Sequence, residues 1–233
     1  MSGVTLSLQE QRGVLVSLKQ GGSAAYKLAP ELDEVFKAGD ERIFSPKRAQ
    51  EADDWILTSF SVPESQRHLR HKLRAILTRM GCGQVSAGLW IAPGHLAAET
   101  SLQLQRAGLM GYADLFRGSY LGESEVSAKV GQWWDLPALE ALYREFLDAH
   151  GGMLERWPAS PPRAEENPEV LRQAFADYVT TVTQWRRLPY MDPGLHHVYL
   201  PEDWAGIAAE KLFADLHNRL APLARQYAQP VLN

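Results

Sequence analysis

The sequence predicts a multidomain α+β fold built from three consecutive parts. A strand-turn-strand pattern with glycines at its tip lies near the N-terminus. The middle of the chain alternates strand and helix patterns, and apolar residues from Ser127 onward recur at helical spacing. The chain has 233 residues, of which 45% are hydrophobic, so it is long enough to form more than one core. We expect domains at 1–48, 50–122 and 125–233.

The N-terminal pattern predicts part of a winged helix. A helical stretch over 4–12 ends at Gly13, and strands over 14–19 and 24–28 flank a polar turn. In a winged helix the helix enters a DNA groove and the hairpin tip reaches the backbone or the minor groove. Glycine-tipped hairpins are also common in proteins that bind no DNA, so the hairpin alone leaves both interpretations open. The residues that this motif would place on DNA are Ser7, Gln9, Arg12, Lys19, Gln20, Ser23 and Lys27.

The middle of the chain predicts a small ferredoxin-like sandwich. A helix from Pro30 to about Phe44 and a polar linker over 50–54 precede it. Apolar spacing then predicts a split β-α-β arrangement. Its expected strands are 55–61, 84–91 with a break at Gly88, and 113–120, and its expected helices are 63–80 and 97–107.

The last part predicts an all-helical domain. Helices are expected from Leu136 to the glycine pair Gly151-Gly152, then over 169–187, and finally from about Trp204 to Tyr227. Loops rich in proline separate them. The second of these helices is expected to turn the following side chains inward: Leu171, Phe175, Tyr178, Val179 and Val182.

Composition excludes several classes of protein. The formal net charge of −4 argues against non-specific coating of nucleic acid, although one small basic patch remains compatible with DNA contact. Cys82 is the only cysteine, so an internal disulfide is impossible and a reducing cytoplasm is expected. No apolar run approaches the length needed to span a membrane, and no apolar signal segment follows Met1. We expect a cytoplasmic protein without a cofactor.

Isolated polar residues give weak signals for chemistry. The adjacent pair His196-His197 has no cysteine or carboxylate at ligand spacing, so a surface loop is favoured over a metal site. His68 and His71 lie among arginines and a lysine, a pattern typical of a solvated basic helix face, with contact to an anionic ligand or DNA as the alternative. Asp192 and Asp203 are expected to serve as turn and helix-cap residues, and Trp133-Trp134 as core or interface.

Three sequence blocks, in order along the chain, resemble one known family. They are the strand Gly83–Pro93 with its G-x-x-x-x-G-x-W-x-x-P pattern, Trp134–Leu136 followed by Leu142–Leu147, and the spaced motif Arg186–Pro193, Leu200–Gly206, Leu212-Phe213 and Leu216. The blocks resemble the PaaX family, bacterial transcriptional repressors of phenylacetic acid catabolism. The resemblance implies a winged helix, a ferredoxin-like middle domain and a helical C-terminal domain.

The resemblance also implies a function and its partners. It implies a homodimeric repressor that binds a double-stranded DNA operator and is released by an acyl-CoA thioester such as phenylacetyl-CoA. Such an effector needs cations beside an apolar pocket. One of the few places in the C-terminal half where paired arginines meet aromatic residues follows the expected helix over 169–187. The effector site expected there comprises Arg186, Arg187, Tyr190 and Trp204. The alternative is that the two arginines only complement a helix C-terminus and pair with Asp192 or Glu202.

The chain departs from the family pattern in three ways. The family has two further helices before its recognition helix, whereas about a dozen residues precede Gly13, so we expect that an N-terminal stretch is missing. Prolines usual in the family near His196 and at Ala205 are absent, and the segment Leu8–Gln11 has no arginine. An alternative function is a metal-dependent nuclease, but Ser59 and Ser61 stand where its metal-binding aspartate is expected, so no enzyme is predicted. A regulator remnant acting only through protein contacts is a third possibility.

Overall fold

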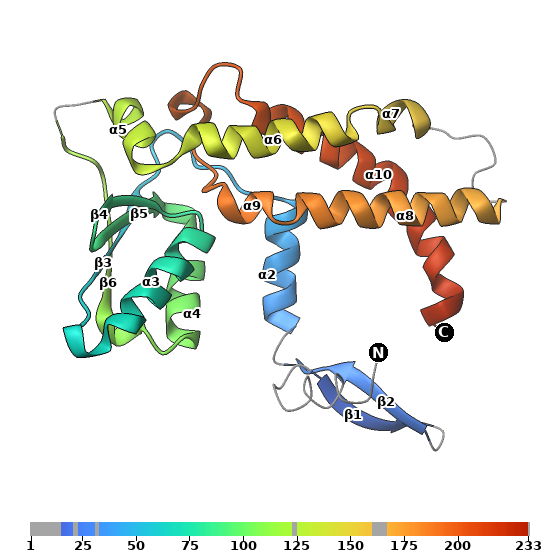
Figure 1. Cartoon of the computed structure of the whole chain (residues 1–233), viewed down its shortest axis with the longest axis horizontal. Coiled ribbons are helices and arrows are strands. Elements are labelled where there is room, and N and C mark those ends of the chain that lie inside the picture. Colours follow the sequence, from blue (N-terminus) through green and yellow to red (C-terminus); the bar gives the residue numbers. More distant parts are fainter. Residues whose placement is uncertain (1–14, 21–22, 31–32, 123–124, 160–166, 233) are drawn as a thin grey trace. The chain divides into compact units, whose positions relative to one another are not determined.

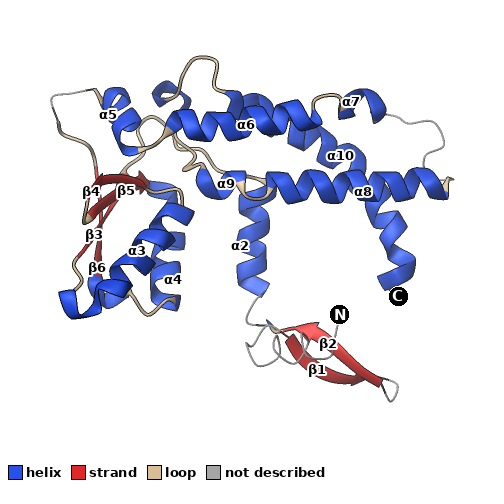
Figure 2. Cartoon of the chain, in the orientation of Figure 1, coloured by secondary structure: helices blue, strands red, loops and turns tan. Residues whose placement is uncertain are grey.

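A computed structural model describes residues 15–20, 23–30, 33–122, 125–159 and 167–232 (Figure 1). They form helices and two antiparallel sheets, which is an α+β fold, as the sequence predicts (Figure 2). The chain divides into two compact units, residues 1–46 and 47–233. None of the described helices is both long and apolar enough to cross a membrane.

The first unit contains the predicted hairpin. Strands β1 (Leu15–Gln20) and β2 (Ser23–Leu28) pair antiparallel, with Gln20 opposite Ser23. The expected helix that precedes them lies outside the described residues, so the winged helix stays a prediction. Helix α2 (Asp33–Phe44) follows the hairpin.

The second unit begins with a four-stranded antiparallel sheet. Its strands and helices run β-α-β-β-α-β along the chain, and the strand order is β4-β5-β3-β6, the element order of a ferredoxin-like arrangement. Figure 1 shows α3 and α4 beside this sheet. The elements are β3 (Trp55–Phe60), α3 (Arg67–Arg79), β4 (Gly83–Ser86), β5 (Leu89–Pro93), α4 (Ala97–Arg106) and β6 (Ala113–Gly118).

One apolar core joins the sheet to its two helices. Alternate residues of β3, including Ile56 and Phe60, pack with Leu73 and Leu77 of α3 and Leu104 of α4. Each of these side chains is buried, because strand alternation and helical spacing direct them toward the same layer. The sandwich therefore leaves the opposite side of α3 facing solvent.

The rest of the second unit is helical. N-caps fix two of the starts: the Asp135 side chain accepts a hydrogen bond from the Ala138 N–H, and Asn167 accepts from Glu169 and Val170. The last helix continues through Pro222 and Pro230. The helices are α5 (Val126–Trp133), α6 (Leu136–His150), α7 (Met153–Arg156), α8 (Pro168–Trp185), α9 (Leu188–Met191) and α10 (Ala205–Leu232).

Several local expectations differ from the structure. The expected strand over 84–91 is a hairpin of two strands, because the chain reverses between β4 and β5 near Gly88. The expected helix over 169–187 ends at Trp185, and a short helix with Pro189 in its first turn follows where a loop was expected. Val179 was expected to point inward, but 45% of its surface is exposed.

Candidate functional site

A partly buried cluster of polar side chains joins the start of the second unit to its helical part. Arg48 lies two residues after the boundary between the units. Its guanidinium donates to both carboxylate oxygens of Glu210 on α10 and lies 3.4 Å from Asp192 Oδ2. The Tyr143 hydroxyl of α6 donates to the same Asp192 oxygen at 2.8 Å. We call Arg48, Tyr143, Asp192 and Glu210 the Arg48 cluster.

The backbone around the cluster is also tightly held. The Ala49 N–H donates to the Gly194 carbonyl at 2.8 Å, and Arg48 reaches the Leu195 carbonyl at 3.4 Å. Gly194 has a φ of +68°, and a Cβ built on it would clash with the Lys47 carbonyl oxygen. Asp192 Oδ1 accepts from the Gly194 N–H at 2.7 Å, which agrees with the expected turn role of Asp192. Residues 47–49 are therefore fixed against the loop that follows α9.

Burial and charge set the protonation of the Arg48 cluster. Burial opposes ionisation of Arg48, but attraction to Asp192 and Glu210 outweighs it and raises the pKa of Arg48. Burial raises the pKa of Glu210 despite the nearby guanidinium. Burial, together with the Asp192 and Glu210 charges, also raises the pKa of Tyr143 well above its usual value. The Tyr143 hydroxyl therefore remains a hydrogen-bond donor at neutral pH, which suits a structural joint.

Aromatic side chains form a second joint between the sheet and the helical part. Trp55 of β3 lies 6.1 Å from Trp134 and 5.9 Å from Tyr199, measured between ring centroids. Trp134 Nε1 donates to the Gly81 carbonyl at 2.8 Å, and a Cβ at Gly83 would come within 2.6 Å of the Trp134 ring. Trp134 is buried, which confirms its expected place in a core or interface.

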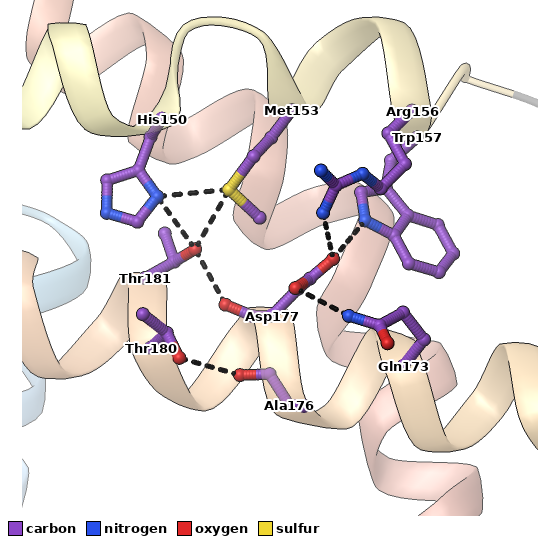
Figure 3. Close-up of polar contacts among 9 residues, drawn as sticks. All are labelled: His150, Met153, Arg156, Trp157, Gln173, Ala176, Asp177, Thr180 and Thr181. Carbon is purple, nitrogen blue, oxygen red and sulfur yellow. Dashed lines mark hydrogen bonds and ion pairs between the residues drawn. The ribbon is translucent and has the colours of Figure 1, made fainter.

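A second polar cluster ties α7 to α8 (Figure 3). Asp177 Oδ2 accepts from Trp157 Nε1 at 2.9 Å and pairs with Arg156 at 3.3 Å, while Asp177 Oδ1 accepts from Gln173 at 2.9 Å. Figure 3 also shows His150 beside the Met153 sulfur, at 3.0 Å. Thr181 Oγ1 donates to the Asp177 carbonyl at 2.8 Å and lies 3.5 Å from His150 Nδ1 of α6. These contacts hold α6, α7 and α8 together.

The structure describes only part of the predicted DNA-binding set. Ser7, Gln9 and Arg12 lie outside the described residues. Lys19 is opposite Ala24 near the hairpin tip, whereas Lys27 is opposite Val16, three residue pairs further from the tip. Lys27 is exposed. The two lysines therefore occupy different levels of the hairpin instead of bracketing its tip, and their DNA contacts stay a prediction.

The predicted effector residues have different surroundings. Arg186 and Arg187 are exposed between α8 and α9, and Arg187 lies 4.0 Å from Glu145. Trp204 is buried against Tyr143, with ring centroids 5.9 Å apart. Tyr190 is half-buried on α9. The effector site stays a prediction, and so does the alternative that the two arginines pair with Asp192 or Glu202. The ion pair seen at Asp192 is the one with Arg48.

The remaining candidate residues, the pair His196-His197 and Asp203, make contacts to nearby groups among the described residues. His196 lies in a loop and caps a short 3-10 helix over His197–Tyr199, where its Nδ1 accepts from the Val198 N–H at 3.3 Å. Among the described residues, no group of three or more His, Cys, Asp or Glu is placed to hold a metal ion. Asp203 is exposed and lies 3.7 Å from Arg144. The Arg48 cluster is the site that sequence reasoning missed.

Two models of known protein families together match almost all of the second unit. Residues 48–130 match the family model described as the PaaX protein central Cas2-like domain, and residues 134–230 match the PaaX-like protein C-terminal domain. Transcriptional repressor PaaX of Escherichia coli (strain K12) is 27% identical over 148 residues, which cover 62% of this chain. That match covers 45% of the repressor, so it spans about half the length of the relative.

A solved structure has a similar fold over most of the chain. It is the uncharacterized protein Rv0674 from Mycobacterium tuberculosis, with a TM-score of 0.54 and 19% identity. The match covers 97% of this chain and 82% of the other, and at this identity it bears on the fold alone. The two adjacent family models and the related repressor show that this chain belongs to the PaaX family.

Proposed function

We propose that the chain is a DNA-binding transcriptional repressor of an operon for phenylacetate or related aromatic catabolism. The observation that carries the proposal is the pair of adjacent family models over 48–130 and 134–230. The antiparallel hairpin ahead of them supports it, because a hairpin is the wing of a winged helix. The repressor would act as a homodimer in the cytoplasm. A titration of DNA from upstream of its neighbouring genes against unrelated duplex tests the proposal.

The Arg48 cluster suggests how the two parts of such a repressor would communicate. An effector shifts a regulator only if it binds one conformation better than another. Residues 47–49 are the covalent path from the hairpin unit into the second unit. Glu210 of α10 and the loop after α9 contact this path directly, and Tyr143 of α6 is linked to it through Asp192. We propose that movement of these helices reaches the hairpin unit through Arg48.

The proposed effector is an acyl-CoA thioester, such as phenylacetyl-CoA. Its phosphates need cations, and the exposed guanidinium groups of Arg186 and Arg187 are the proposed contacts. Binding at one hundred times Kd would raise the melting temperature by about 5–10 °C. The double variant Arg186→Ala, Arg187→Ala should lose this rise while its unliganded melt changes little, because both side chains are exposed.

Calorimetry with phenylacetyl-CoA provides the check on this site. The double variant Lys211→Ala, Arg225→Ala removes two exposed charges from α10 and is the matched control. It should keep the affinity of the unaltered chain. Equal thioester affinity in the unaltered chain and the Arg186, Arg187 variant would show that the effector site lies elsewhere.

We also propose that the chain is not an enzyme. The nuclease alternative needs clustered carboxylates that hold metal ions beside the scissile phosphate. The cross-strand neighbour of Ser59 is Asp114, a single carboxylate, and the described residues contain no group placed to hold a metal. No observation on the described residues favours hydrolysis over DNA binding.

A further inference from the structure

Helix α3 carries an unusual concentration of positive charge. Five of the 24 lysines and arginines of the chain lie among its 13 residues, and none of those 13 is acidic. The whole chain has a formal charge of −4, so α3 contrasts with the rest of the molecule. The exposed basic residues are Arg67, His68, His71, Lys72 and Arg79.

The apolar side of α3 packs into the core of the sandwich. Leu73 and Leu77 have no exposed surface, and Ile76 is 5% exposed. No apolar stripe is therefore left for insertion into a lipid surface, which an amphipathic membrane helix needs. The side of α3 that faces solvent is a basic face, which we define by the five exposed residues named above.

Backbone carbonyl groups hold several of the long cations in place. Lys72 Nζ donates to the Ala107 carbonyl at the end of α4, at 3.1 Å. Arg74 Nη2 donates to the Ala87 carbonyl at 3.2 Å. A carbonyl group carries no formal charge, so these bonds orient the side chains without neutralising them. Helix α4 adds the exposed Arg106 beside Ala107.

One carboxylate lies against a cation of the helix. Glu64 Oε2 is 3.4 Å from Arg70 Nη2, and the side chains are 76% and 37% exposed. An ion pair this exposed is worth little and is screened by salt. Arg70 lies outside the basic face as defined, so its pair with Glu64 does not neutralise the five residues of that face.

The extent of the basic face determines the kind of anion that fits it. From Arg67 to Arg79 the helix rises about 18 Å, at about 1.5 Å per residue. A small anion would need convergent cations in a pocket. A line of cations suits a polyanion, and duplex DNA carries one charge per about 1.7 Å of its axis.

We propose that the basic face of α3 binds the phosphate backbone of double-stranded DNA, as a second contact beyond the hairpin. The inference rests on the proposed DNA-binding function and adds a sequence-independent term to it. Such a contact would strengthen binding to every duplex without changing which sequence is preferred. Each phosphate neutralised adds about 0.9 to the slope of log affinity against log salt concentration.

The test uses the full chain, a fluorescent duplex of random sequence and a series of NaCl concentrations. Substituting Lys72→Gln and Arg79→Gln should reduce the salt slope by about two and weaken low-salt binding about tenfold. The control variant Lys211→Gln, Arg225→Gln has the same change in charge on exposed positions of α10 and should keep the slope. Circular dichroism would verify that both variants remain folded.

The outcomes separate this proposal from the proposed function. If the unaltered chain binds duplex and the Lys72, Arg79 variant keeps its slope, the basic face is not a DNA contact, while the repressor proposal survives. An equal loss in the control variant would also contradict the inference, because the effect would then be one of net charge. If the unaltered chain binds no duplex at any salt concentration, both proposals are wrong.

Discussion

Replacing Gly194 with alanine should destabilise the second unit by about 3–5 kcal/mol. Gly194 has φ +68°, where an L side chain costs about 1–2 kcal/mol. Its Cβ would also clash with the Lys47 carbonyl, so the backbone must move and the Ala49 to Gly194 hydrogen bond would be lost. Urea unfolding followed by tryptophan fluorescence measures the loss, because all seven tryptophans lie in the second unit.

The matched control for this substitution is Gly108→Ala. Gly108 has nearly the same φ, +69°, but a Cβ there would meet nothing within 4 Å. Its loss should be about 1–2 kcal/mol, the cost of backbone strain alone. Equal losses for the two variants would show that the close approach of Gly194 to Lys47 adds nothing to stability.

Replacing Arg48 with methionine should cost about 2–4 kcal/mol of unfolding free energy. The substitution keeps an apolar stem but leaves the carboxylates of Asp192 and Glu210 together without their cation. Breaking a buried ion pair destabilises a protein mainly because it leaves the remaining charge buried without a partner. Here the loss is smaller because Arg48 and Glu210 are partly exposed, at 22% and 28%. The same urea experiment measures the change.

The effect of Arg48→Met should depend on pH. The pKa of Glu210 is already raised by burial, and loss of Arg48 would raise it further. A raised carboxyl pKa means that the folded state binds a proton more tightly, so its stability contribution is full at low pH and is lost as pH rises through the folded pKa. The cost of the substitution should therefore shrink as pH falls toward about 4. The exposed Arg144→Met, which removes the pairs with Glu140 and Asp203, should cost only about 0.5 kcal/mol at neutral pH.

Local patterns predicted most of the fold. Alternation found the hairpin at residues 15–28, and helical spacing found α3, α4, α6 and α8 within a few residues. The errors arose where tertiary pairing decides the outcome. The region around Gly88 looked like one interrupted strand, and only pairing of β4 with β5 shows a reversal there. Pro189 suggested a loop, but proline is also favoured in the first turn of a helix such as α9.

The Arg48 cluster had no local signal in the sequence. Arg48 is 144 residues from Asp192 and 162 from Glu210, and no periodicity marks such a pairing. The turn role of Asp192 was predictable because an aspartate before Pro193-Gly194 commonly accepts a backbone N–H. Its second oxygen, which binds Arg48 and Tyr143, was not. The family resemblance suggested the class of effector, whereas the predicted effector residues were chosen because paired arginines lie near aromatic residues there.

Binding of the unaltered chain to DNA from upstream of its neighbouring genes is the most direct test of the repressor proposal. Fluorescence anisotropy would compare that DNA with unrelated duplex of the same length at one salt concentration. The upstream DNA should bind more tightly by a factor of about a thousand or more. The salt slope should fall by about two when Lys19 and Lys27 are replaced with alanine. Equal affinity for both duplexes, with a slope unchanged in that variant, would contradict the repressor proposal.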